Sequence, residues 1–475
     1  MAIVHKGASL EPSKTDLVAG WMPHQRWYHG KGHDPVLRRV GGFRFEDPAG
    51  QVGVETLLLA DTAASPVVVY QVPLTYRPEP LEGGEQALLG TMEHSVLGRR
   101  WVYDAPHDPV YVDQLVDTIL RDRAADEAQA SVGSNARATG TSTNDNDSSV
   151  TSSAVLTGEQ SNTSIICRMA GPQGELAEPI IVKVFRTLQH GPNPDVVVQS
   201  ALTVEGSDRV PRALGHLSGE WDSVDGSSVE SGHLAFAQEF IPGVEDAWRV
   251  ALVAAAEGRD FSARARELGV VTAQIHAALA HALGNREATD ADRDALVASM
   301  RSRYAAAVDL VPDLASRADA VEAVVESVRS ARWPALQRIH GDYHLGQVLD
   351  VPERGWVALD FEGEPLRPLA ERVLPDLTQR DLAGMLRSFD YAAGSVALAD
   401  PGTDASAWAA DARAAFLDGY AEVAGERDGD DLALVRALEL DKALYEVVYE
   451  ARNRPTWLPI PLEAALHLTS AEGTP

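Results

Sequence analysis

The sequence predicts an α+β fold with two lobes, because a β-rich stretch is followed by an α-rich one. Up to about residue 243, short runs of β-branched and aromatic residues are separated by Gly, Pro and Asp, which is typical of strands joined by turns. From about residue 244 the chain changes to long Ala-, Leu- and Arg-rich segments with helical spacing. We therefore expect a β-rich first half, a mainly helical second half and a cleft between them.

Four segments are expected along the 475 residues. They are a β-rich N-terminal cap (1–120), a flexible linker (121–155), an N-lobe β-sheet (156–243) and a helical C-lobe (244–475). The linker prediction follows from composition: its second half lacks aromatic residues and is dominated by Ser, Thr, Asn, Asp and Gly. Such a segment buries too little apolar surface to offset the entropy lost on ordering.

Strands and helices are expected at particular runs. The strand candidates are 36–47, 52–62 and 66–77 in the cap, and 164–170, 178–185 and 233–240 in the N-lobe. The helix candidates are 264–283, 319–333, 407–424 and 431–453.

Charge and cysteine content exclude several functions. The formal net charge is -29, from 70 acidic and 41 basic residues, so phosphate backbones and anionic lipid surfaces are repelled. The one cysteine, Cys167, permits neither a disulfide framework nor a multi-cysteine metal site within the chain, and a small buried residue is the simplest role for it. The N-terminal residues contain no apolar run of signal-peptide length, and no run is long enough to cross a membrane. We expect a cytoplasmic protein, a monomer, without nucleic-acid or membrane partners.

The strongest chemical signal is HGDYHLGQ at 340–347, followed by VALDFE at 357–362. Phosphoryl transfer needs a carboxylate near the attacking hydroxyl and oxygen ligands for Mg²⁺ on the phosphates. A hairpin return of the loop would place Asp342, Gln347 and Asp360 at one end of a small sheet. Asp342 would then orient or accept the hydroxyl proton. Gln347 and Asp360 would bind Mg²⁺ through oxygen. The alternative is that these are solvated turn residues. That interpretation would suit a lone HGD, but the combined pattern favours the functional one.

The nucleotide side is expected in the N-lobe. Lys183 lies inside the apolar run IIVKVF, where an ammonium is costly unless it meets anions such as ATP phosphates; an edge lysine reaching solvent is the alternative. The polar segment EQSNTS at 159–164 offers backbone N–H groups and short side chains to phosphates, with Ser161, Asn162 and Ser164 as candidates, although the chain has no Walker A sequence. Adenine is expected beside the strand end Gln238, Glu239 and Phe240.

These motifs resemble the maltokinases, a group within the aminoglycoside phosphotransferase-like kinases. The resemblance rests on HGDYHLGQVL, DFEGEP and EQSNTS, and continues through 368–393, 438–461 and an opening HQRWYHGKG at 24–32. It implies a two-lobed protein-kinase-like fold and ATP- and Mg²⁺-dependent phosphorylation of maltose to maltose 1-phosphate, a precursor of α-1,4-glucan (glycogen-like) biosynthesis.

The resemblance also implies residue roles. Asp342 matches the catalytic Asp, Gln347 and Asp360 the Mg²⁺ ligands, and Lys183 the phosphate-contacting Lys; Gln stands where related kinases carry Asn. The residues implied near the sugar are His344, Asp441, Lys442, Tyr445 and Glu446. Trp457 is a further candidate, with a core position as the alternative. One departure is Val197, where the family leads us to expect a Glu that pairs with the strand Lys; Glu205 is the candidate substitute.

Three alternatives to maltose kinase activity remain at this point. The acceptor is glucosamine or another hexose, since related kinases with the same cap phosphorylate glucosamine, or it is an aminoglycoside. The third alternative is a kinase-fold pseudoenzyme, which the Val197 departure favours and the presence of Lys183, Asp342, Gln347 and Asp360 opposes.

Overall fold

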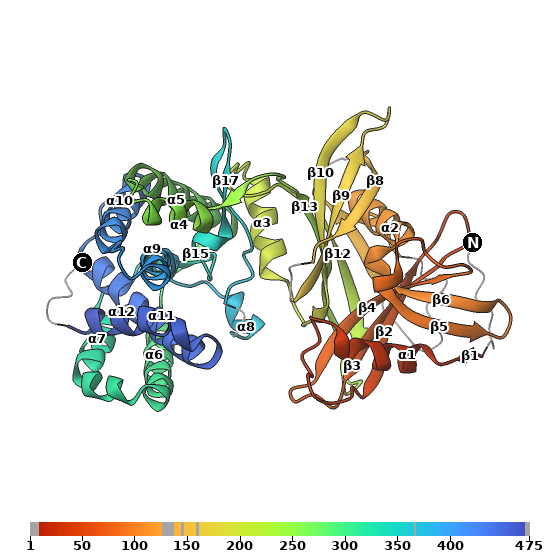
Figure 1. The fold of residues 1–475 in the computed structure, drawn as a ribbon, viewed down its shortest axis with the longest axis horizontal. Helices are drawn as coiled ribbons and strands as arrows, with labels where there is room; N and C mark the ends of the chain where they lie inside the picture. Colours follow the sequence, from red (N-terminus) through yellow and green to blue (C-terminus); the bar gives the residue numbers. More distant parts are fainter. Residues whose placement is uncertain (1–8, 126–136, 144–146, 158–160, 365–366, 471–475) are drawn as a thin grey trace. The chain divides into compact units, whose positions relative to one another are not determined.

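The structure, a computed structural model, describes residues 9–125, 137–143, 147–157, 161–364 and 367–470. The chain divides into two compact units: unit 1 comprises Met1–Ser200 and Arg212–Ile241, and unit 2 comprises Ala201–Pro211 and Pro242–Pro475. Unit 1 is mainly β and unit 2 mainly α (Figure 1). The predicted α+β class is therefore confirmed.

Unit 1 begins with a seven-stranded antiparallel sheet in the order β1-β5-β6-β4-β3-β2, with β11 added beside β4. The strands are β1 (Leu10–Glu11), β2 (Leu37–Phe45), β3 (Gly53–Asp61), β4 (Val68–Arg77), β5 (Leu88–His94), β6 (Gly98–Asp104) and β11 (Thr187–Leu188), with the helix α1 (Lys14–Trp21). The strand predictions at 36–47, 52–62 and 66–77 are confirmed as β2, β3 and β4. Their alternating apolar residues fill the core of this sheet.

A second, six-stranded antiparallel sheet follows in the order β7-β12-β13-β10-β9-β8. Its strands are β7 (Ala138–Ser142), β8 (Ser149–Val155), β9 (Asn162–Ala170), β10 (Leu176–Phe185), β12 (Ala213–Asp222) and β13 (Val229–Glu239). Unit 1 also contains the helix α2 (Pro109–Leu120) and the part of α3 (Pro194–Val204) up to Ser200. The predicted N-lobe strands are confirmed as β9, β10 and β13. Buried residues of both sheets belong to one core cluster, so the predicted cap and N-lobe share a core.

The flexible linker predicted at 121–155 is wrong where it is described. Residues 138–142 and 149–155 are the edge strands β7 and β8, and α2 packs against both. Figure 1 shows α2 beside β8. Backbone pairing with β12 and β9 holds these strands, and it does not depend on apolar side chains. Residues 126–136 and 144–146 of the predicted linker lie outside the described residues.

Unit 2 is a helical domain with a small three-stranded sheet. Its helices are α4 (Ala247–Ala256), α5 (Ser262–Leu283), α6 (Asp290–Leu310), α7 (Ala318–Ser330), α8 (Leu369–Arg372), α9 (Gln379–Ala399), α10 (Ser406–Ala424), α11 (Gly429–Asn453) and α12 (Pro459–Leu468). Its strands are β14 (Glu245–Asp246), β17 (Val348–Val351) and β18 (Gly355–Ala358) in one sheet and the pair β15 (Asn285–Arg286) and β16 (Leu336–Gln337). The four predicted helices correspond to α5, α7, α10 and α11.

Two glycines let α5 and α10 approach closely. A Cβ at Gly269 would lie 2.0 Å from the carbonyl oxygen of Phe416, and a Cβ at Gly419 would lie 1.9 Å from that of Arg266. Only glycine fits these positions, so the backbones of the two helices are in direct contact.

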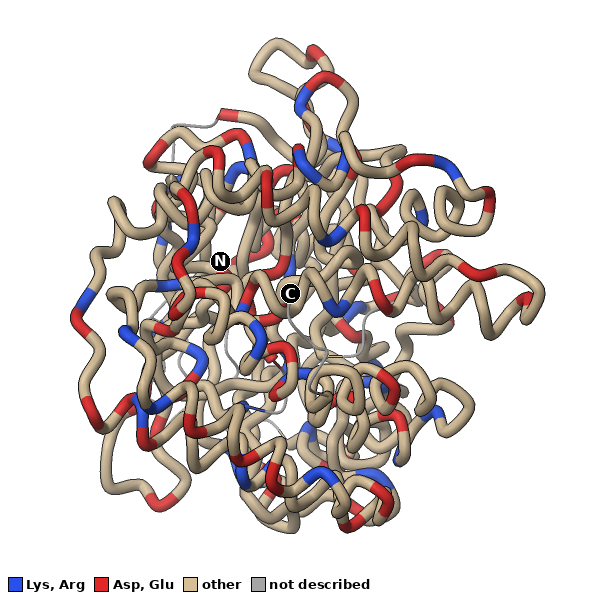
Figure 2. The backbone as a smooth tube through the Cα atoms, turned by 90° about the vertical axis from the view of Figure 1, so that its left-hand side faces the viewer, with Lys and Arg blue, Asp and Glu red and all other residues tan. Residues whose placement is uncertain are grey.

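Acidic and basic residues are interspersed along the chain (Figure 2). Among the described helices, none combines the length and the apolar character required to cross a bilayer.

Candidate active site

The hairpin of β17 and β18 brings Gln347 and Asp360 together, as the sequence predicted. The N–H of Leu359 donates to the carbonyl of Gln347 over 2.9 Å. The side-chain amide of Gln347 then donates to Asp360 Oδ2 over 3.0 Å. Asp360 has a φ of 62°, which is uncommon for a non-glycine residue and is found preferentially at functional sites.

The carboxylates of Asp342 and Asp360 both influence the pKa of the His344 imidazole. Burial lowers the pKa of His344, whereas the carboxylates of Asp342 and Asp360 raise it. Both carboxylates therefore lie within electrostatic range of one side chain. The arrangement places the acidic groups of the two motifs around a single site in unit 2.

A buried carboxylate on α9 holds the loop that carries Asp342. Asp381, which is 1% exposed, accepts from the backbone N–H groups of His340 and Gly341, each over 2.8 Å. Nε2 of His276 lies 2.9 Å from the same carboxylate. The His340 ring packs 4.6 Å from that of Phe361 and its Nε2 lies 2.8 Å from a backbone carbonyl. The loop conformation is thus set by buried polar partners, which are costly to break.

Lys442 joins Asp342 to a second carboxylate. Its Nζ donates to Asp342 Oδ1 over 3.0 Å and to Glu364 Oε1 over 2.8 Å. Burial alone would raise the pKa of Asp342, but Lys442 and His344 more than compensate and lower it. The same cation, with Arg303, outweighs burial at Glu364 and lowers its pKa to about 2. Both carboxylates are therefore ionised at neutral pH.

Asp441 belongs to the ion-pair network behind this contact. Arg303 donates to Asp441 Oδ2 over 2.7 Å and to Glu364 Oε2 over 3.2 Å, and Arg380 reaches Asp441 Oδ2 over 3.4 Å. Asp441 is 1% exposed, so it pairs with the neighbouring arginines and offers almost no surface to a ligand. The ring of Tyr445 lies beside this network, 5.0 Å from Lys442 Nζ and 5.4 Å from the Arg303 guanidinium.

In unit 1, Lys183 meets a carboxylate that the sequence interpretation missed. Its Nζ donates to Asp195 Oδ2 over 2.9 Å, and Asp195, at the start of α3, is fully buried. The expectation that the partner is absent at Val197, or replaced by Glu205, is therefore wrong: Glu205 lies 2.7 Å from His281 Nδ1 instead. The carboxylate of Asp195, two residues before Val197, supplies the contact with Lys183.

The other predicted nucleotide residues lie on neighbouring strands of this sheet. Ser164 of β9 is buried opposite Lys183, while Ser161 is exposed just before the strand and Asn162 begins it. On β13, Gln238 is buried, and its Oε1 makes no hydrogen bond to the described residues. The rest of the predicted phosphate segment, 159–160, lies outside the described residues.

Two backbone groups at the predicted adenine position are already engaged. The N–H of Glu239 donates to the carbonyl of Arg212 over 2.9 Å, and that of Phe240 to the carbonyl of Pro179 over 3.1 Å. An adenine bound at this strand end would therefore form hydrogen bonds with groups of the segment other than these two N–H donors.

The pair Gln347 and Asp360 fits a Mg²⁺ site in its chemistry. Mg²⁺ prefers oxygen ligands, commonly one or two carboxylates with the rest from water and substrate phosphates. Because the amide nitrogen of Gln347 points to Asp360, its amide oxygen is the atom left for a cation. The donor set therefore agrees with the ion that the motif implies.

Comparison with known proteins shows the family to which the chain belongs. The family model described as the maltokinase N-terminal cap domain matches residues 21–108. A glucosamine kinase of Mycolicibacterium smegmatis is 30% identical over 350 residues, which is 67% of this chain and 80% of that protein. The chain belongs to the aminoglycoside phosphotransferase-like kinase family. It is a phosphotransferase grouped with the sugar kinases of that family.

Two further matches are also to glucosamine kinases. A glucosamine kinase of Streptacidiphilus jiangxiensis is 33% identical over 208 residues, covering 42% of this chain and 47% of that protein. A solved glucosamine kinase in complex with glucosamine, ADP and inorganic phosphate has a TM-score of 0.66 at 24% identity, covering 96% of this chain and 99% of the other. The second match shows that this kinase has the predicted two-lobed protein-kinase-like fold.

Several residues that contact the predicted site residues, or the loop that carries Asp342, were not identified from the sequence. They are Asp195, Arg303, Glu364, Asp381 and Arg387. Asp381 and Arg387 gave one usable signal, since each is a charged residue in the stretch 379–399, whose neighbours are otherwise largely apolar. A charge on a buried helix face requires a partner, but the sequence does not say which one.

Proposed function

We propose that this kinase transfers the γ-phosphoryl group of ATP to maltose, giving maltose 1-phosphate for α-1,4-glucan (glycogen-like) biosynthesis. The observation that carries the choice of a neutral sugar is the contact of Lys442 with both Asp342 and Glu364. Lys442 already neutralises these two carboxylates, so an amino sugar would bring a second cation to a pair of anions that is already occupied. Like charges at such a distance disfavour binding, so a sugar that carries only hydroxyl groups suits the site better.

The aromatic face of α11 supports a disaccharide. Tyr445 and Tyr449 are four residues apart, which places them about one turn, or ~6 Å, apart along the helix. Tyr449 is 41% exposed. Aromatic faces cover the apolar side of pyranose rings, and two such faces in sequence suit two linked glucose units better than one.

The proposed chemistry begins with the sugar hydroxyl beside Asp342. As its oxygen forms a bond to the γ-phosphorus, the bond from that phosphorus to the β–γ bridging oxygen breaks and ADP leaves. Asp342, ionised at neutral pH, orients the hydroxyl and accepts its proton. Gln347 and Asp360 hold Mg²⁺, which supplies charge neutralisation to the phosphates. Lys183, oriented by Asp195, contacts the phosphates in unit 1.

The other assigned contacts complete this proposal. His344 forms a hydrogen bond with the sugar and the Glu446 carboxylate accepts one from it. Lys442 and Tyr445 lie beside them, and Asp441 holds the supporting arginines. Ser161, Asn162 and Ser164 face phosphate, and Gln238, Glu239 and Phe240 adjoin the adenine. A cytoplasmic monomer with sugar and ATP as its ligands is the form we propose.

Glucosamine is the second candidate, because the relatives described above are glucosamine kinases. A panel of maltose, glucosamine and glucose separates the two: ATP consumption is measured for wild type, Asp342→Asn and the control Asp309→Asn, an exposed carboxylate of α6. We expect turnover with maltose, a loss of about 10²–10⁴-fold in Asp342→Asn with nearly unchanged maltose affinity, and no change in the control.

Each other outcome of the panel contradicts a defined part of the proposal. Turnover with glucosamine alone replaces the acceptor and keeps the mechanism. Binding of Mg-ATP without turnover of any sugar indicates a pseudoenzyme. Loss of maltose binding in Asp342→Asn refutes its catalytic role, since it would then be a binding residue.

A further inference from the structure

Arg387 is a buried cation in the middle of α9. Its side chain is 1% exposed, and a buried guanidinium is tolerated only when charged partners surround it. Nε and Nη2 both donate to Glu446 Oε2 of α11, over 3.0 and 2.9 Å. Nη1 donates to Asp390 Oδ2 over 2.7 Å. Arg387 thus connects α9 to the helix that carries Lys442.

The two donors to Glu446 converge on a single oxygen. Among the described residues, none donates a hydrogen bond to Oε1 of Glu446, whereas Oε2 accepts two. The Glu446 side chain is 13% exposed and lies one turn from Lys442, which contacts Asp342. This arrangement fixes the carboxylate while leaving one oxygen to accept from a hydroxyl group.

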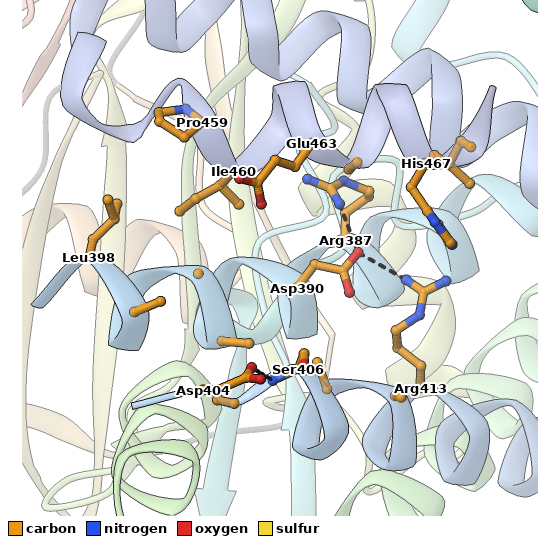
Figure 3. A pocket seen from close by; sticks show the side chains of 18 of the residues that line it. Arg387, Asp390, Leu398, Asp404, Ser406, Arg413, Pro459, Ile460, Glu463 and His467 are labelled. Atoms are coloured by element: carbon orange, nitrogen blue, oxygen red, sulfur yellow. Dashed lines mark hydrogen bonds and ion pairs between the residues drawn. The ribbon is translucent and has the colours of Figure 1, made fainter. Parts of the chain in front are cut away.

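Further ion pairs hold Arg387 itself. Arg413 of α10 donates to Asp390 over 3.1 Å and to Glu439 of α11 over 2.8 Å. Figure 3 shows Arg387 and Arg413 both directed at Asp390. These residues line a cavity of about 640 Å³ between α9, α10, α11 and α12 (Figure 3). The guanidinium of Arg387 is therefore held by ion pairs to α9 and α11, and Asp390, one of its partners, is shared with Arg413.

We propose that Arg387 is a positioning residue of the sugar site, holding the Glu446 carboxylate so that Oε1 accepts a hydrogen bond from a sugar hydroxyl. The inference rests on the proposed function, because it takes Glu446 as a sugar contact. Arg387 itself touches no substrate. Arg387 affects the reaction only by orienting Glu446. Replacing Arg387 should therefore have no further effect once Glu446 can no longer accept the hydrogen bond from the sugar.

A double-mutant cycle tests this dependence. In Arg387→Met we expect the KM for maltose to rise about tenfold or more, with the KM for ATP unchanged. Arg387→Lys keeps the charge but loses the two-donor geometry, so it should restore part of the affinity. In Glu446→Gln the KM for maltose also rises, and adding Arg387→Met should have little further effect. Arg301→Met, which removes an exposed arginine paired with Glu322, is the matched control and should leave both KM values unchanged.

A pH profile provides a readout that a purely structural ion pair would not change. Burial raises the pKa of Glu446, Asp390 raises it further, and Arg387 and Lys442 oppose this. Removing Arg387 takes away one of the two opposing cations, so the pKa of Glu446 rises above its value in wild type. Maltose affinity in Arg387→Met should therefore be lost on acidification at a higher pH than in wild type.

Three outcomes overturn the inference: an unchanged maltose KM with only a lower melting temperature, additive effects in the cycle, or an unshifted pH profile. If Arg387→Met does not fold, Arg387→Lys with and without Glu446→Gln completes the cycle. If wild type turns over glucosamine and not maltose, the proposed function fails, and the cycle is measured with glucosamine. If calorimetry detects no sugar binding by wild type, both proposals fail.

Discussion

Lys442 sets the charge state of the candidate site, because its ammonium lies against two carboxylates at once. It outweighs the effect of burial on both Asp342 and Glu364, whose pKa values are lowered. In turn these carboxylates raise the pKa of Lys442, so the ammonium is retained. The sequence indicated Lys442 as a sugar contact; the structure shows it in direct contact with the proposed base.

Replacing Lys442 should move the acid limit of the reaction. In Lys442→Met the pKa of Asp342 rises, because burial is then less opposed, and the proton acceptor is lost at a higher pH as the solution is acidified. We expect the acid limb of kcat/KM to shift to higher pH. The measurement is a pH–rate profile against Lys31→Met, an exposed lysine of the cap, which should match wild type. An unshifted profile would show that Lys442 does not control Asp342.

At the scale of elements, β7 shows how a polar segment becomes part of a sheet. Its five residues pair with β12, and Gly140 lies against the backbone of α2. A Cβ at Gly140 would lie 1.9 Å from the carbonyl oxygen of Thr118. The strand is thus held between a neighbouring strand and a helix, and glycine is required for the close approach.

Gly140→Ala should destabilise unit 1. The added methyl meets backbone that cannot move without disturbing α2, and overpacking of this kind costs ~1–3 kcal/mol. We expect a melting temperature several degrees lower, measured by circular dichroism. Thr139→Ala, at the exposed neighbouring position, serves as the control and should melt close to wild type. Equal melting of both variants would mean that β7 is not packed on α2 in solution.

At the scale of the whole molecule, the proposed contacts separate by unit. The residues assigned to the sugar belong to unit 2, whereas Lys183 and the adenine segment belong to unit 1. The net charge of -29 is spread over interspersed acidic and basic residues, as Figure 2 shows, and the cationic contacts of the site are supplied locally by Lys442 and the arginines.

Hydrogen exchange can separate the two sets of contacts. Maltose added without nucleotide should slow amide exchange in α11 and in the loop 340–347, because these carry the proposed sugar residues. The cap strands β2, β3 and β4 should exchange as before. A sugar that the panel shows not to be phosphorylated is the control. Protection centred on the cap strands would place the sugar elsewhere and contradict the assignment.

Local patterns were sufficient for much of the fold and for the centre of the site. The strands β9, β10 and β13 and the helices α5, α10 and α11 follow from periodicity within single segments. The contact of Gln347 with Asp360 was also predictable, because it needs only a hairpin between residues 13 positions apart. β7 and β8 were not predictable, because composition reports apolar burial and says nothing of backbone pairing with a distant strand.

The sequence by itself determined the α+β division, the hairpin and the group of acidic residues at its end, since each depends on neighbours along the chain. Only the tertiary structure decided which charges meet: Lys183 with Asp195, Lys442 with Asp342 across 100 positions, and Arg387 with Glu446 across 59. The physical reason is that a buried charge requires a partner of opposite sign, and the packing of helices and strands, not proximity in sequence, brings that partner within reach.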